Sequence, residues 1–401
     1  MKRSITILLL FIFMCALAVR VGVAFYLTPK INFADAYYYD RAAENICVGK
    51  GAVIRETWVA NRMPLYPYML AFFKTYASSS EIYVVSVRIF QSFLNALLVI
   101  PVFFMVTAIL SPGYGLLAAA LIAFDPIHIL SSSLLLTEVV YSFCLTFFIW
   151  GTISFSKRGT LFYFLISGIS VVAGMYIRES MFHIIAILAL SGIFVRRCRA
   201  IRAYMLTLFI ISICALCPWI IRNHVLLHEF VPFTTNSGFT LYDAVNPHAD
   251  GGTDVSKFGN EAPEGLSEVE LDRFWKRKAS EAIRHDPVRV MLLTIRKFGK
   301  FWNIIPNAQE FRRPLLIAGF SVFYIPLFIC FIIGLIVLAR NGTCEVFMIY
   351  VPVIYAVLLH LVINGSLRYR MPLEPFVIVF AVAGLRGIVD KMRCNISQSP
   401  L

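Results

Sequence analysis

The stretch ITILLLFIFMCALAVRVGVAFYL, at residues 5–27, is an apolar run long enough to cross a membrane as one α-helix. Similar runs recur along the 401-residue chain, which is 59% hydrophobic and only 15% charged. The mean hydropathy of +0.77 is too high for a soluble domain. Alternation with the period of two that marks transmembrane strands is not found. The sequence therefore predicts an all-α polytopic membrane protein.

Ten membrane spans are expected, within a single transmembrane domain over residues 1–401. Each span is an apolar run of helical length. The expected spans cover residues 5–27, 84–110, 113–127, 133–155, 160–175, 180–195, 203–221, 313–339, 346–364 and 372–388. The fifth and sixth spans are short and are joined by Tyr176-Ile177-Arg178-Glu179, so the number of spans at this point stays open.

The basic residues predict the orientation of the chain. Segments assigned to the inside hold two acids, Glu345 and Asp390, and many basic residues: Lys2, Arg3, Lys157, Arg158, Arg196, Arg197, Arg199, Arg202, Arg340, Arg386, Lys391 and Arg393. Membrane proteins retain Lys and Arg on the cytoplasmic side. Both termini are therefore expected inside, and loops 28–83 and 222–312 outside. The same rule explains the net charge of +13, so no nucleic-acid partner is expected.

The N-terminal run has a second interpretation, a cleaved signal peptide. Lys2-Arg3, an apolar stretch and Ala16-Leu17-Ala18 imitate one. Because the apolar run continues to Leu27, a retained span is preferred. Arg20 lies inside this span, where it either reaches toward the outer surface or faces a polar cavity.

The nine cysteines do not indicate a disulfide framework. Cys214-x-x-Cys217 has the spacing of a redox or metal motif, but it lies in an apolar run without histidine or acidic neighbours. Gly49-Lys50-Gly51 lacks the third glycine of a dinucleotide-binding loop. No soluble nucleotide-binding domain is therefore expected.

The outer loops are expected to contain helices. In loop 28–83, residues 36–48 place apolar side chains on one helical face, and residues 64–76 are apolar enough for a second short helix beside the membrane. In loop 222–312, Ser267-Glu268-Val269-Glu270 has the pattern of a capping box, and the helix that follows is expected to end near Arg284.

A second helix of loop 222–312 is amphipathic. Its apolar face consists of Val288, Met291, Leu292, Ile295, Phe298 and Trp302. Its cations are Arg289, Arg296, Lys297 and Lys300. Two interpretations stay open. The helix lies in the headgroup plane with its cations facing lipid phosphates, or it is an ordinary surface helix packed on the protein.

Charged residues gather at the outer ends of the spans. They come from five segments: Asp35 and Arg62 in the first outer loop, Thr137-Glu138, Arg178-Glu179, Arg222-Asn223, and Arg368-Tyr369-Arg370. A single arginine at a helix end is commonly an interface anchor. Five such segments on one side of the membrane indicate instead an outward-facing cavity lined by guanidinium and carboxylate groups.

These residue types suit the transfer of a sugar from a lipid phosphate. Arginine binds phosphate through two parallel donors and keeps its charge in any environment. The lipid phosphate gains negative charge as the sugar leaves, and fixed cations stabilise that charge. A carboxylate near the acceptor hydroxyl removes its proton, so one base and one phosphate clamp suffice for a single inverting displacement.

The order of these motifs resembles that of the GT-C membrane glycosyltransferases that use polyprenyl-phosphate sugars. These are the bacterial relatives of the protein O-mannosyltransferases and the lipid A aminoarabinose transferases. The matching elements are Asp35 to Tyr39, Arg62 to Pro67, Thr137-Glu138, Trp219 to Asn223, and Arg368 to Pro372. The resemblance runs from the first span to the last. It implies a GT-C-like fold and a site facing the periplasm or exterior of a bacterial inner or plasma membrane.

The resemblance also implies roles for particular residues. Asp35 is the expected catalytic base, in the extracytoplasmic catalytic loop 28–83, and Glu138 is the second acidic position. The expected ligands of the donor phosphate are Arg62, Arg178, Arg222, Arg368 and Arg370. The expected supporting side chains are Tyr39, Tyr66 and Asn223. Metal dependence varies among the relatives, so a divalent metal is possible but no metal ligand is assigned.

The chain departs from the family pattern in two places. Many relatives have Arg-Pro-Pro where this chain has Arg62-Met63-Pro64, and some have a second acid where it has Ala36. The larger relatives also carry a soluble C-terminal domain, which is not expected here. Acceptor recognition is therefore expected in loop 222–312 or in a partner, and the acceptor is open to glycan, lipid or protein.

Two other functions would use similar residues. A transporter or flippase of lipid-linked glycans also needs a cationic cavity, but transporters tend to show internal repeats and broken helices at mid-membrane. Similarity between the two halves of this chain is not found. An oligosaccharide ligase or polymerase also uses lipid-linked donors, but more often relies on arginine and histidine without an acid in the first loop.

Overall fold

The computed structural model describes residues 3–28, 34–55, 57–194, 201–306 and 312–398. Within these ranges the regular elements are helices, which confirms the predicted all-α class. The bundle consists of α1 (Arg3–Tyr26), α4 (Ser80–Ala96), α5 (Val99–Ile109), α6 (Pro112–Ala123), α8 (Glu138–Arg158), α9 (Leu161–Met175), α10 (Ser180–Phe194), α11 (Arg202–Leu227), α15 (Pro314–Asn341), α16 (Cys344–Val362) and α18 (Glu374–Gln398).

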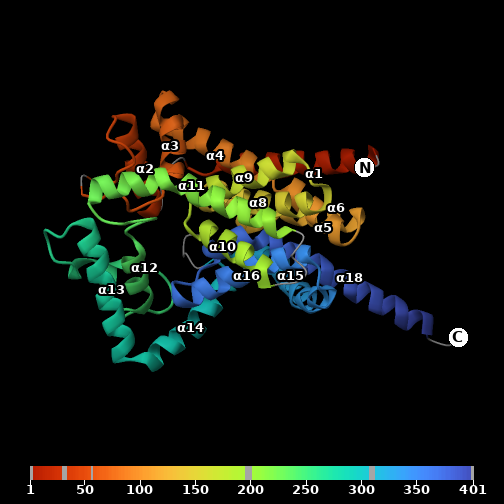
Figure 1. Cartoon of the computed structure of the whole chain (residues 1–401). Coiled ribbons are helices and arrows are strands. Elements are labelled where there is room, and N and C mark those ends of the chain that lie inside the picture. The colour runs from red at the N-terminus through yellow and green to blue at the C-terminus, as the bar shows by residue number, and fades with distance from the viewer. Residues whose placement is uncertain (1–2, 29–33, 56, 195–200, 307–311, 399–401) are drawn as a thin grey trace.

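Shorter elements connect the helices of the bundle. They are α2 (Ala34–Cys47), α3 (Leu65–Tyr76), α7 (Pro126–Ser131), α12 (Ser237–Val245), α13 (Glu268–His285), α14 (Pro287–Phe301), α17 (Leu367–Arg370), and the 3₁₀ turns η2 (Val255–Lys257), η3 (Gly259–Glu261) and η5 (Met371–Leu373). Figure 1 shows α2, α12 and α13 at the end of the bundle opposite both termini. This arrangement agrees with the predicted placement of the long loops on one side and the termini on the other.

The predicted spans correspond to helices, with differences in length. Seven described helical stretches are long and apolar enough to cross a membrane: Arg3–Tyr26, Ser80–Ile109, Glu138–Arg158, Arg202–Leu227, Pro314–Arg340, Cys344–Val362 and Leu367–Cys394. The shorter helices α6, α9 and α10 occupy the other three expected positions. The chain is a multi-pass membrane protein, and the number of ten crossings stays a prediction.

Polar caps explain where the predicted bounds differ. The span expected over residues 113–127 ends as α6 at Ala123, because Asp125 caps the next helix by accepting the backbone N–H of Ile127 at 2.9 Å. The span expected from residue 133 begins instead at Glu138, whose carboxylate lies in the first turn of α8. Negative charge is stabilised at that end of a helix.

Arg20 is fully buried and faces protein rather than the outer surface. Its guanidinium donates to the carbonyl oxygens of Ala16 at 3.1 Å, Ile122 at 2.9 Å and Ala123 at 2.6 Å. The last two belong to the final turn of α6, where carbonyl groups have no partner within the helix. Of the two interpretations of Arg20, the structure thus favours a polar environment inside the protein, and backbone carbonyls at the end of α6 provide it.

Two glycines allow α15 and α18 to cross at close range. A Cβ atom on Gly334 would overlap the carbonyl oxygen of Phe380, and one on Gly384 would overlap that of Cys330. Small residues at such crossings are a general feature of helix packing in membranes. The pair therefore fixes α18, and with it the segment that precedes α18 at the outer end.

The helices expected in the outer loops are present. Helices α2 and α3 match the predicted residues 36–48 and 64–76 to within two residues at each end. Helix α13 begins at the predicted capping box, with the Ser267 hydroxyl accepting the Glu270 N–H and the Glu270 carboxylate accepting the Ser267 N–H. These helices bring the polar outer segments into fixed positions.

Helix α14 presents its apolar face outward, but most of its cations contact protein. Val288, Met291, Leu292, Ile295 and Phe298 are 49–72% exposed. Arg289 donates to two carbonyl groups at the end of α12, Lys297 is buried and donates to Val362, and Lys300 pairs with Asp250. The interpretation that the cations face lipid phosphates is therefore wrong for Lys297, which is buried. The interfacial position of the helix stays a prediction.

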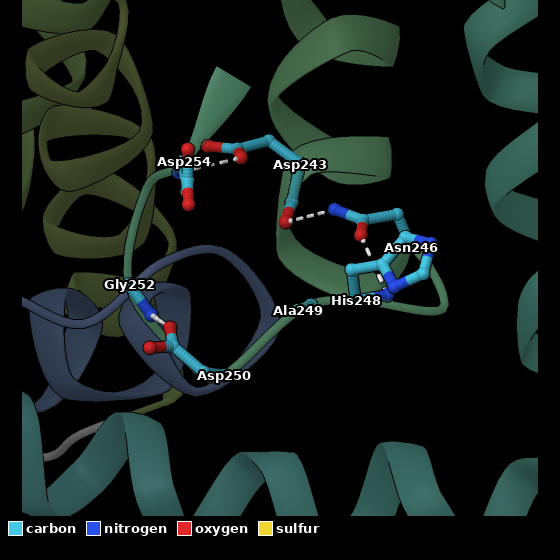
Figure 2. A pocket seen from close by; sticks show the side chains of 7 residues that line it. All are labelled: Asp243, Asn246, His248, Ala249, Asp250, Gly252 and Asp254. Atoms are coloured by element: carbon cyan, nitrogen blue, oxygen red, sulfur yellow. Dashed lines mark hydrogen bonds between the residues drawn. The ribbon is translucent and has the colours of Figure 1, made fainter. Parts of the chain in front are cut away.

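Helices α12, α13 and α14 form an outer unit with its own small core. Trp275 of α13 stacks on Tyr242 of α12 with ring centroids 5.1 Å apart. Figure 2 shows the pocket beside Asp243, in which Asp243 accepts the backbone N–H of Asp254 and Asp250 accepts that of Gly252. These carboxylates hold the loop 243–254 in place.

Candidate functional site

Five of the charged residues predicted from the sequence meet at the outer end of the bundle. Asp35 lies between two arginines, 3.2 Å from the Arg62 guanidinium and 2.9 Å from that of Arg368. Glu138 accepts from Arg178 at 2.6 Å and from Arg368 at 2.5 Å. Arg368 therefore bridges both carboxylates. These five residues are called the arginine–carboxylate cluster below.

Four members of the cluster are placed by helix ends, whereas Arg62 lies in the irregular segment before α3. Asp35 and Glu138 occupy the first turns of α2 and α8, where the helix dipole stabilises negative charge. Arg178 follows α9, and its guanidinium also donates to the Thr137 hydroxyl at 3.0 Å. Arg368 lies on the short helix α17, whose start is capped by the Ser366 side chain.

The cluster is open on one side. The side chains of Arg62, Arg178, Arg368 and Asp35 are 17–32% exposed, whereas Glu138 is only 2% exposed. One oxygen of Glu138, Oε2, is buried and has no hydrogen-bond partner among the described residues. A buried acceptor without a partner is costly to the folded state.

The charges of the cluster affect the protonation of Asp35. Burial tends to raise the pKa of the Asp35 carboxyl, but the Arg368 and Arg62 guanidiniums outweigh burial and hold this pKa below its usual range. Asp35 is therefore ionised at neutral pH. Three guanidiniums face two carboxylates, so the cluster has a formal charge of +1 and can accept one further negative charge.

The predicted supporting tyrosines line the inner side of the cluster. Tyr39 and Tyr66 are buried and meet edge to face, with ring centroids 5.1 Å apart. The Arg62 guanidinium lies 5.9 Å from the Tyr39 ring. The Tyr66 hydroxyl donates to Gln91 at 2.8 Å. Both tyrosines are thus buried beside the cluster and support it by packing.

Arg222 and Asn223 contact the backbone beside the cluster rather than its carboxylates. Arg222 donates to the carbonyl of Val59 at 2.8 Å and lies over the Trp219 ring at 4.6 Å. Asn223 is buried and donates to the carbonyl of Val231 at 3.0 Å. The structure therefore does not bring Arg222 together with the other predicted phosphate ligands.

Arg370 also lies outside the cluster. Its side chain is fully buried, pairs with the equally buried Glu374 at 2.6 Å, and donates to the carbonyls of Phe301 and Asn303. It ties the end of α14 to the start of α18. This position does not fit the predicted contact with a donor phosphate.

Two polar residues near the site were not predicted from the sequence. Gln91 of α4 accepts from Tyr66 and donates to the carbonyls of Ser132 and Leu134 ahead of α8. Its signal in the sequence is an amide in an otherwise apolar run. Glu268 of α13 contacts the segment that carries Arg62, whereas the sequence predicts for it only a position within a capping box.

A metal site is not assigned. Among the described residues no group of three or more His, Cys, Asp or Glu is arranged to hold a metal ion. Asp35 and Glu138, the two acids expected at the site, are instead bridged by Arg368.

Comparison with solved structures shows the fold. The apo form of the Archaeoglobus fulgidus oligosaccharyltransferase matches with a TM-score of 0.62 and 14% identity, over 99% of this chain and 52% of that chain. Archaeal oligosaccharyltransferase AglB from the same organism, in complex with an inhibitory peptide and a dolichol-phosphate, matches with a TM-score of 0.59 and 14% identity, over 99% and 51%.

A third structure, the same enzyme tethered to an acceptor peptide containing the NVT sequon, matches with a TM-score of 0.59 and 14% identity, over 98% of this chain and 50% of that chain. The chain thus spans about half the length of these proteins, with which it shares the GT-C fold. No family model and no curated protein matches the sequence.

Proposed function

We propose that the chain is an inverting glycosyltransferase that moves a sugar from a polyprenyl-phosphate donor to an acceptor at the extracytoplasmic face of the membrane. The proposal rests on the arginine–carboxylate cluster, in which Arg62, Arg178 and Arg368 surround two carboxylates at the outer end of a GT-C fold. The similar solved structures support the proposal, because they are oligosaccharyltransferases and one of them holds a dolichol-phosphate.

The charge of the cluster favours a donor with a single phosphate. A polyprenyl-phosphate sugar is a phosphodiester with one negative charge, which balances the formal charge of +1. A diphosphate-linked donor would bring two negative charges and leave one without a counter-ion. Arginine is suited to hold the phosphate because its planar donors match two phosphate oxygens at once.

The proposed reaction is one displacement at the anomeric carbon. The acceptor oxygen forms a bond to that carbon while the bond from the carbon to the phosphate oxygen breaks. The acceptor proton passes to Asp35, and the electron pair leaves with the polyprenyl phosphate. The arginines stabilise the charge that develops on the phosphate, and attack from the opposite face inverts the sugar.

Donor binding prepares Asp35 for this role. Without donor, both of its oxygens accept from guanidinium groups, Arg62 on one side and Arg368 on the other. A bound phosphate competes for the same donors and leaves one carboxylate oxygen facing the acceptor. Glu138 keeps Arg178 and Arg368 in place.

The partners follow from this proposal. The donor is a sugar on a polyprenyl phosphate, with its prenyl chain among the bundle helices in a bacterial inner or plasma membrane. The acceptor is a glycan, lipid or protein that reaches the cluster from the periplasm or exterior. We expect the outer unit, α12 to α14, to meet this acceptor, because α12 and α13 lie at the end of the bundle away from both termini (Figure 1).

The test is to incubate the purified full-length protein, reconstituted with a cell-envelope extract as acceptor source, with short-chain polyprenyl sugars. One set carries a monophosphate and a matched set a diphosphate. We expect the monophosphate donors to lose their sugar and to yield free polyprenyl phosphate. Use of the diphosphate set alone would support a ligase or polymerase. Movement of intact donor across vesicles would support a flippase.

A further inference from the structure

We infer that Glu268 and Arg222 are positioning residues that hold the backbone of Val59 and Ala60 and thereby aim Arg62 at Asp35. On the function proposed above, the same contacts aim Arg62 at the donor phosphate. The outer unit, which supplies Glu268, would then control one of the three arginines of the cluster. Arg222 lies near the end of α11 and Glu268 begins α13, both far from Arg62 in the chain.

The contacts account for every polar backbone group of Val59 and Ala60. The Val59 N–H donates to Glu268 at 2.8 Å, and the Ala60 N–H donates to the same carboxylate at 3.1 Å. The Val59 carbonyl accepts from Arg222 at 2.8 Å, and the Ala60 carbonyl accepts from the Thr235 N–H at 3.1 Å. The three partner residues, Glu268, Arg222 and Thr235, all come from outside loop 28–83.

The position of Arg62 depends on this segment because only Asn61 separates it from Ala60. Arg62 itself makes one bond to Asp35, at 3.2 Å, and one to the carbonyl of Asn61, at 3.3 Å. Such long bonds alone would hold a flexible side chain loosely. The fixed backbone of Val59 and Ala60 therefore helps to direct the Arg62 side chain toward Asp35.

Glu268 is held firmly enough to act as an anchor. It is 4% exposed and begins α13, where the capping box of Ser267 and Glu270 fixes the first turn. Its carboxylate also accepts the Thr235 hydroxyl. One turn further along, Asp272 accepts the Gly238 N–H at 2.6 Å, which joins α13 to α12.

Arg222 acts from the opposite side of the same segment. It lies near the end of α11, and its neighbours Trp219 and Asn223 donate to the carbonyls of Phe233 and Val231. These bonds fix the chain that leads to Thr235. The motif Trp219 to Asn223 thus holds two backbone segments in register, a role that differs from the phosphate binding expected from the sequence.

The consequence is a coupling between the two sides of the site. A molecule that binds the outer unit and shifts α13 would move Glu268, and through residues 59 and 60 would move Arg62. Arg62 shares Asp35 with Arg368, so its displacement would alter both the phosphate clamp and the proposed base. Acceptor binding and donor binding would then influence each other.

The experiment compares Glu268→Gln with Glu281→Gln, an exposed position on the same helix, in the purified full-length protein. Binding of a short-chain polyprenyl phosphate is measured for each variant, alone and combined with Arg62→Gln. Hydrogen exchange is followed in peptides that contain Val59 and Ala60. Losing a hydrogen bond to a charged group commonly weakens binding about tenfold or more, so a loss of about tenfold is expected for Glu268→Gln.

If Glu268 acts through Arg62, Glu268→Gln weakens binding in the parent protein but adds no loss in the Arg62→Gln variant, and exchange at residues 59 and 60 rises. Equal losses in both backgrounds, or unchanged exchange, would overturn the inference. Should Glu268→Gln not fold, Thr235→Val removes one of the bonds to Glu268 and is measured in the same way. If the parent protein does not bind polyprenyl phosphate, the proposed donor is wrong, and the exchange result alone decides whether Glu268 holds the segment.

Discussion

At the scale of single residues, the arginines of this chain fall into two groups by their partners. Arg62, Arg178 and Arg368 bind carboxylates and keep part of their surface exposed. Arg222 donates to a backbone carbonyl, and Arg370 is fully buried between the Glu374 carboxylate and two backbone carbonyls. A guanidinium that is bound to carboxylates and partly open can exchange them for a phosphate, whereas one buried among carbonyls cannot do so without unfolding its surroundings.

Replacing Arg62 is expected to change the pH dependence of transfer. Arg62 is one of the two charges that lower the pKa of Asp35, so Arg62→Gln raises this pKa. The acid limb of the profile of kcat/KM against pH then moves to higher pH, because Asp35 loses its basic form earlier as the pH falls. The profile is measured with the monophosphate donor.

Arg62→Lys keeps the positive charge and serves as the control. Its acid limb is expected to stay close to that of the parent protein, although its donor affinity falls because lysine lacks the planar pair of donors. An acid limb that moves equally in both variants, or in neither, would contradict the electrostatic link. The same lowered pKa stabilises the folded state above the usual carboxyl range, and this stability is lost as the pH falls through the lowered pKa.

At the scale of elements, helical geometry separates residues that look alike in the sequence. Arg368 and Arg370 are two positions apart, which corresponds to roughly 200° around a helix, so they cannot face the same site. The sequence predicts that both lie at the outer end, and this is where they are. Which one faces the cluster depends on the packing of α14 and α15, which the sequence does not reveal.

The Arg370–Glu374 pair is expected to contribute to stability rather than to donor binding. Arg370→Met leaves the fully buried Glu374 without its partner, which costs about 3–5 kcal/mol. The loss is measured by thermal unfolding of the purified protein. The double variant Arg370→Met with Glu374→Met recovers much of this loss. If Arg370→Met unfolds at the same temperature as the parent protein but binds polyprenyl phosphate more weakly, Arg370 is instead a ligand of the donor.

The crossing of α15 and α18 is expected to be intolerant of any added side chain. Gly384→Ala forces the two helices apart, at a cost of about 1–3 kcal/mol, because the new Cβ meets the backbone of α15. Gly319→Ala is the matched control on α15, where nothing lies within 4 Å of the new atom. Equal thermal stability of the two variants would show that the close crossing is not needed.

At the scale of the whole molecule, the fold could be predicted more fully than the site. Apolar runs predict where helices lie, and basic residues predict which ends share a side. The cluster, however, joins residues up to 333 positions apart: Asp35 of α2 and Arg368 of α17 meet only in the folded chain. Sequence patterns predict a common side of the membrane but not contact across it.

Whether Asp35 takes the acceptor proton is tested by comparing Asp35→Asn with Asp40→Asn. Asp40 lies on the same helix but pairs with Lys74. The purified proteins receive a polyprenyl-phosphate donor labelled in its sugar, and both sugar transfer and donor binding are measured. The parent protein and Asp40→Asn are expected to transfer the label with inversion. Asp35→Asn is expected to bind donor but to transfer at least about 100-fold more slowly. Transfer by Asp35→Asn at the parent rate would contradict the proposed mechanism.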